Sequence, residues 1–150
     1  MKYRTENEFE HFDFSECYVK DIEWGNDYFH IWLDQVRILP ENSCNRDIRV
    51  MRTNNLQFTI HEAKIVSFIR EGVKIYNADG VPMGERDDEV VSEDEYMEIL
   101  PLFLEGMCYS IRKDKHRYSL ILDAMDESTY ELVIEGSGET EGWDRFLNLE

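Results

Sequence analysis

The chain has few cysteines, and their placement excludes several classes of protein. Cys17, Cys44 and Cys108 are odd in number, widely separated and without a Cys-x-x-Cys spacing, so neither a disulfide framework nor a cysteine zinc site is indicated. Reduced thiols in a cytoplasm are the simplest interpretation. The four histidines show no common metal-ligand spacing, and we expect neither a metal nor a cofactor.

Long apolar runs and catalytic motifs are also missing. No apolar run approaches the ~20 residues of a membrane helix, and residues 1–8 (MKYRTENE) lack the apolar core of a signal peptide. The chain contains no phosphate-binding loop, no Gly-x-Ser-x-Gly elbow and no dinucleotide fingerprint. We therefore expect one cytoplasmic domain over residues 1–150, without membrane association, and a binding protein is favoured over an enzyme.

Positive charge is scarce, with 16 Lys and Arg against 33 Asp and Glu and a net charge of −17. Residues 85–98 hold eight acids and one arginine, and residues 123–150 hold nine acids and one arginine. Such a chain repels nucleic acid and attracts basic proteins, or it uses the charge only for solubility. The basic turn 112–117 would pair with the acids of 85–98 or remain solvated. The candidate contacts for a basic protein partner are Asp87, Asp88, Glu89, Glu93, Asp94 and Glu95.

β-patterned sequence is abundant, and its clearest example is the stretch 12–40. Two runs flank Gly25-Asn26, which suits a two-residue hairpin turn. A turn closed there sets Ile22 opposite Phe29 and Asp21 opposite His30. Further strands are predicted from alternation and β-branched content. Their ranges are 48–53, 56–61, 63–70, 73–76, 107–112, 118–122 and 129–134.

One substantial α-helix is predicted near 93–104, because Ser92-Glu93-Asp94-Glu95 forms a capping box and apolar residues follow at helical spacing. Pro101 ends or kinks it. The fold class is therefore mainly β, an antiparallel sandwich or partly open barrel of about eight to ten strands with this helix. Three segments are expected to lie outside the strands: a polar lead-in (1–11), a mobile acidic loop (81–91), and a Gly-rich linker with a short C-terminal segment (136–150). In the last, Trp143, Phe146 and Leu147 would dock on the domain or bind a partner.

The predicted hairpin carries an aromatic face with a histidine inside it. Alternation places Tyr28, His30 and Trp32 together, with Asp21 positioned to orient His30. This face is a candidate ligand-binding surface, or it reflects only the preference of aromatic residues for strands. Two further alternatives remain open: an apolar-ligand barrel lined by these residues, and a hydrolase using His30 with Asp21 or Asp34.

The pattern Phe-x-x-Cys-Tyr-Val-x-x-Ile (14–22), followed by Phe-x-Ile-x-Leu (29–33) and Leu-Pro-Glu-Asn (39–42), resembles the opening of small uncharacterised bacterial β-proteins. Some of these are encoded near toxin-immunity genes. The resemblance covers roughly 12–70 and implies a small bacterial cytoplasmic binding protein without catalytic residues. We therefore expect a non-enzymatic protein whose acidic segments engage a basic protein, as an immunity-type inhibitor does.

Overall fold

The computed structural model describes residues 1–149, and most of its strands belong to one antiparallel sheet of ten strands. All neighbouring strands in this sheet are antiparallel. Alternating apolar residues give each strand one face that can be buried in the core. In spatial order its strands are β1 (Tyr3–Glu6), β15 (Gly138–Trp143), β7 (Leu56–His61), β4 (Tyr28–Asp34), β3 (Cys17–Gly25), β12 (Met107–Asp114), β13 (Arg117–Asp123), β14 (Thr129–Glu135), β8 (Lys64–Arg70) and β11 (Glu89–Val90).

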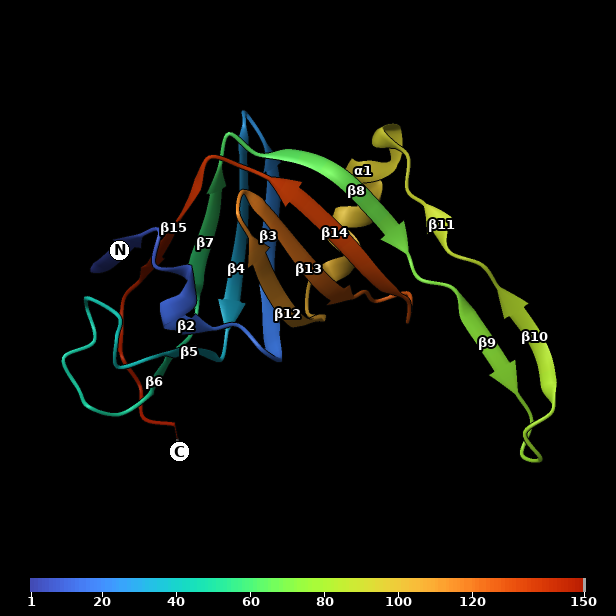
Figure 1. The fold of residues 1–150 in the computed structure, drawn as a ribbon, viewed down its shortest axis with the longest axis horizontal. Coiled ribbons are helices and arrows are strands. Elements are labelled where there is room, and N and C mark those ends of the chain that lie inside the picture. Colours follow the sequence, from blue (N-terminus) through green and yellow to red (C-terminus); the bar gives the residue numbers. More distant parts are fainter. Residues whose placement is uncertain (150) are drawn as a thin grey trace.

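The sheet folds over on itself at two chain connections that lie side by side. β7 continues into β8, and β14 continues into β15, yet β7 pairs with β15 in one half of the sheet and β8 with β14 in the other. The amide of Ser137 donates to the carbonyl of His61 at 2.9 Å, which joins the two bends. Figure 1 shows both bends at the top, where the halves lean together. The fold is sandwich-like and does not close into a barrel, which confirms the predicted fold class.

The core lies between the two halves and is rich in aromatic side chains. Phe58 on β7 lies 5.2 Å from Phe14 and 5.9 Å from Tyr118 between ring centroids. Beside the main sheet, a small sheet packs near the 3-10 turn η1 (Phe9–His11). Its strands are β2 (Phe12–Asp13), β5 (Val36–Ile38) and β6 (Met51–Thr53).

The predicted helix is present, although only its centre is α-helical. It consists of η2 (Glu93–Glu95), α1 (Tyr96–Ile99) and η3 (Leu100–Phe103), and the capping box of Ser92 and Glu95 is formed. Pro101 has no amide to donate, which favours the 3-10 form in the last turn. Tyr96 packs edge-on against Trp24 of β3. Within residues 1–149, no helix has the length and apolar character needed to cross a bilayer.

The predicted hairpin turn was displaced by one residue, so both cross-strand partners predicted from it were wrong by two residues. The structure pairs Gly25 with Tyr28, so the turn residues are Asn26 and Asp27, with φ of 53° and 65°. A type I′ turn needs positive φ at both central positions, and Asn and Asp tolerate that conformation. As a result, Glu23 lies opposite His30 and Asp21 lies opposite Trp32.

Three segments expected to be irregular contain strands. The lead-in 1–11 contributes β1, which pairs with β15. Segment 81–91, predicted as a loop, holds β10 (Pro82–Arg86) and β11, and β10 pairs with β9 (Val73–Tyr76). Segment 136–150, predicted as a linker, holds β15 between β1 and β7, and Trp143 is fully buried. Phe146 packs on the core, which confirms docking of this end on the domain.

Candidate functional site

A two-stranded arm leaves the body of the protein and carries apolar side chains into solvent. It consists of β9, β10 and the turn 77–81, and Figure 1 shows it projecting beyond β8 and β11. Ile75 is 56% exposed and Met83 is 65% exposed. Such side chains usually become buried, and an isolated hairpin of two strands is only marginally stable. The exposed apolar residues of the arm are Val73, Ile75, Tyr76, Val81 and Met83.

The base of the arm is fixed by close backbone packing. The amide of Gly72 donates to Oδ1 of Asp88 at 2.6 Å, and Nη2 of Arg86 donates to the carbonyl of Glu71 at 3.2 Å. A Cβ on Gly72 would lie 2.2 Å from the carbonyl oxygen of Arg86. Glycine at this position therefore allows the two strands to approach as they leave the sheet.

The six acidic residues predicted to contact a partner follow the arm directly and are all exposed. We call them the acidic rim: Asp87, Asp88, Glu89, Glu93, Asp94 and Glu95. Glu89 forms an ion pair with Arg70 at 3.6 Å, and Ser92 donates to both Asp94 and Glu95 at 2.6 Å. The hydroxyl and the amide of Ser92 both donate to Glu95 and hold the pKa of that carboxyl group below its usual value. Asp87 and Glu93 have no side-chain hydrogen bond or ion pair with any described residue. The rim therefore keeps its negative charge available next to the arm.

Tyr28, His30 and Trp32 do share one face of β4, as alternation predicted, and that face points outward. Tyr28 stacks on His30 with ring centroids 5.9 Å apart. A shallow pocket of about 240 Å³ lies here, bounded also by His61, Thr59 and Thr140. Trp32 and Asp21 do not line it, so the structure brings together only part of the predicted ligand site.

The contacts of His30 do not match the predicted Asp–His arrangement. Nδ1 of His30 is hydrogen-bonded to Oγ1 of Thr59 at 2.8 Å and lies 3.2 Å from Nε2 of Gln57, an amide nitrogen that can only donate. Burial lowers the pKa of His30. Asp34 is four residues along the same strand, about 13 Å away, and accepts from the amide of Asn55. Oδ1 of Asp21 accepts from the amide of Ile22. Neither carboxylate orients the imidazole.

A cluster of buried acidic groups was not predicted. Glu139 and Glu141 of β15 point into the core and are 1% and 0% exposed. Oε1 of Glu139 accepts from Nζ of Lys113 and from the hydroxyl of Tyr118, both at 2.9 Å, while Oε1 of Glu141 accepts from Thr5 at 2.8 Å. Oε2 of each carboxyl group lacks a partner among the described residues. Burial, together with the charge of Glu139, raises the pKa of Glu141 to about 9.

Two carboxyl groups can be buried together when one is neutral and the other is paired with a cation. Burial and the neighbouring Glu139 favour the neutral form of Glu141, and Glu139 forms an ion pair with Lys113. Within residues 1–149, no group of three or more His, Cys, Asp or Glu side chains is placed to hold a metal ion. Alternation along β15 places Glu139, Glu141 and Trp143 on one face, but two of the three are acidic, so the sequence shows no apolar pattern there.

No known protein family, curated protein or solved structure matches this chain.

Proposed function

We propose that this is a non-catalytic interaction protein that binds a basic protein partner through the arm and the acidic rim. The observation that carries the proposal is the arm itself: a projecting hairpin with five exposed apolar side chains, followed in the chain by six exposed acids. Apolar centres surrounded by charged residues are the usual composition of protein interfaces. Ile75 and Met83 are more than half exposed, and burying the rest of either side chain would contribute about 1–2 kcal/mol.

The charge of the chain favours a basic partner over a second copy. Each copy carries a net charge of −17, so two acidic rims brought together would repel each other. A partner with lysine and arginine around an apolar patch would instead be attracted at long range, and the rim would speed its association. The three cysteines are free, which supports a reducing cytoplasm as the place of this interaction. An inhibitor of the immunity type, binding a basic toxin, would have these properties.

We expect the double variant Ile75→Asp/Met83→Asp to weaken partner binding at least about 100-fold, because both central apolar contacts are lost. The protein is immobilised and incubated with lysate from its source, and bound proteins are eluted with a salt gradient. The partner is then identified, purified and titrated against each variant. Binding of a basic protein should fall as salt rises, since the rim attracts it electrostatically.

The matched control is Met125→Asp, because Met125 is 64% exposed and lies outside the arm. This control should bind the partner as the wild type does. A partner retained equally by the arm variant and by Met125→Asp, or one whose affinity is indifferent to salt, would contradict the proposal.

A further inference from the structure

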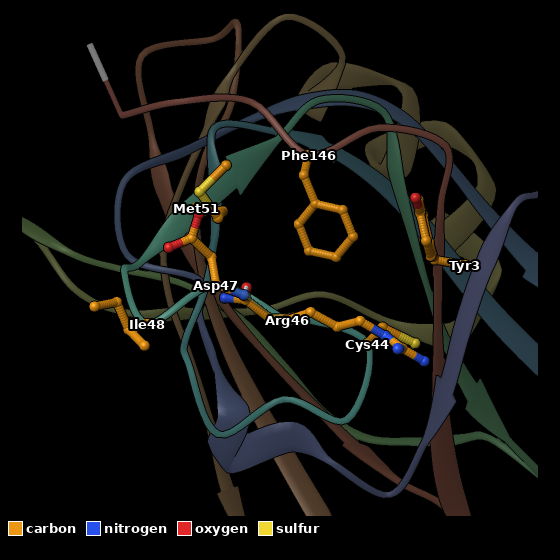
Figure 2. Close-up of a pocket in the computed structure, with 8 residues that line it drawn as sticks. Tyr3, Cys44, Arg46, Asp47, Ile48, Met51 and Phe146 are labelled. Carbon is orange, nitrogen blue, oxygen red and sulfur yellow. Dashed lines mark hydrogen bonds between the residues drawn. The ribbon is translucent and has the colours of Figure 1, made fainter.

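A second candidate site lies at the opposite end of the molecule from the arm, beside the loop between β5 and β6. It is a groove of about 640 Å³. Figure 2 shows Phe146 at its centre between Tyr3 and Met51, with Arg46 extended toward Cys44. The volume falls in the range of about 300–1,000 Å³ that small-molecule sites occupy.

The walls of the groove are aromatic and are held in place by contacts behind them. Phe146 packs edge-on against Tyr3 at 4.8 Å and against Trp143 at 5.7 Å between ring centroids. The amide of Arg52 donates to the carbonyl of Leu147 at 2.9 Å, and the amide of Leu147 donates back at 2.7 Å. These bonds fix the segment that carries Phe146, so the apolar wall is formed before any ligand binds.

The loop that forms the other wall is also fixed. Nδ2 of Asn45 is shared by three carbonyl groups, those of Ile38 at 3.1 Å and of Leu39 and Arg49 at 3.2 Å. Asp47 is engaged by the side chain of Arg49 at 3.1 and 3.2 Å. Both residues line the groove, and these contacts hold their loop in place.

Arg46 is left as an unpaired cation at the mouth of this apolar groove. It is exposed and makes no hydrogen bond or ion pair with the described residues, whereas the neighbouring Asp47 is neutralised by Arg49. In a chain with a net charge of −17, Arg46 therefore provides a positive group on the same groove as the rings of Tyr3 and Phe146. Guanidinium binds carboxylate and sulfonate groups through two parallel hydrogen bonds.

We propose that this groove binds a small organic acid, with its apolar body against Tyr3, Phe146 and Met51 and its anionic group on Arg46. The site is separate from the arm, so a ligand could bind here whether or not the protein partner is engaged.

The test uses the fluorescent probe anilinonaphthalene sulfonate and its uncharged parent, N-phenylnaphthylamine. The sulfonate probe should bind the wild type, and Arg46→Gln should weaken its binding about three- to tenfold. Binding of the uncharged parent should not change in Arg46→Gln, because only the anionic contact is removed. Arg46 is exposed, so the substitution leaves the core intact.

Cys44 reports whether the probe occupies this groove. Its thiol lines the groove, whereas Cys17 and Cys108 are wholly buried, and burial raises the pKa of Cys17 to about 12. N-ethylmaleimide should therefore label Cys44 first, and saturating sulfonate probe should slow that labelling several-fold. Absence of sulfonate binding, equal binding by Arg46→Gln, or an unchanged rate of Cys44 labelling would each overturn the proposal.

Discussion

Replacing Lys113 by methionine is expected to destabilise the protein by about 3 kcal/mol, because it leaves a buried carboxylate without its cation. Nζ of Lys113 lies 2.9 Å from Oε1 of Glu139, whose side chain is 0% exposed. The ammonium group also lies over the ring of Tyr118, 5.5 Å from its centroid. The loss would remove a large part of the ~5–15 kcal/mol that stabilises a typical domain. Urea unfolding at pH 7 measures the change.

A second substitution distinguishes lost charge balance from lost packing. Adding Glu139→Gln to Lys113→Met should restore much of the stability, because the amide keeps a hydrogen-bond acceptor for Tyr118 without a charge. Arg112→Met is the matched control, since Arg112 is the exposed neighbour on the same strand and its replacement should change stability by no more than about 0.5 kcal/mol. Equal losses in Lys113→Met with and without Glu139→Gln would contradict the assigned role of the ion pair.

The stability of the wild type should fall as pH rises from about 6.5 to 8, at up to about 1.4 kcal/mol per pH unit. Burial and the neighbouring Glu139 raise the pKa of Glu141 from 4.5 in the unfolded chain to about 9 in the folded protein. Between those values the folded state holds a proton that the unfolded state has released. Unfolding therefore becomes easier with rising pH until the folded group ionises.

Glu141→Gln should remove this slope, because the amide keeps the contact with Thr5 but does not titrate. The difference in slope would amount to roughly 2 kcal/mol between pH 6.5 and 8. His30 acts in the opposite direction, since its lowered pKa makes stability rise with pH, but only up to about 6.5. Exposed Glu98 gives the control Glu98→Gln. Parallel pH profiles for the wild type and Glu141→Gln in thermal unfolding would show that Glu141 is charged in the folded state.

The strands of this fold could be predicted well where apolar residues alternate. The predicted ranges 56–61 and 73–76 coincide with β7 and β9. Phe29, Ile31 and Leu33 are fully buried, as expected of one face of β4. Here a local pattern was sufficient, because a strand with one apolar face has only one way to orient itself on a core.

β15 could not be recognised because its inward residues are acidic. Glu139 and Glu141 enter the core only because Thr5 of β1, Lys113 of β12 and Tyr118 of β13 meet them there. Those partners are distant in sequence, so composition alone indicated a polar linker. The partner of Lys113 in the basic turn 112–117 was missed for the same reason. Lys113 pairs with Glu139, which is distant in sequence, and not with the acids of 85–98.

The candidate sites depend on long-range geometry to different degrees. The acidic rim could be read from local charge density. The groove could not, because Tyr3, Arg46 and Phe146 come from three distant parts of the chain. The predicted hairpin register was wrong for a local reason: Asn26 and Asp27 form the turn with positive φ, whereas a turn at Gly25-Asn26 had been expected.

The most direct test of the arm as a binding surface is site-specific photocrosslinking in the cells that make the protein. A photoreactive residue at Met83 samples the arm, and the same residue at Met125 is the control, because the two side chains are 65% and 64% exposed. Crosslinking from Met83, but not from Met125, to one basic protein is the predicted result. Crosslinking from Met83 to a second copy of this chain, or equal crosslinking from both positions, would contradict the proposal.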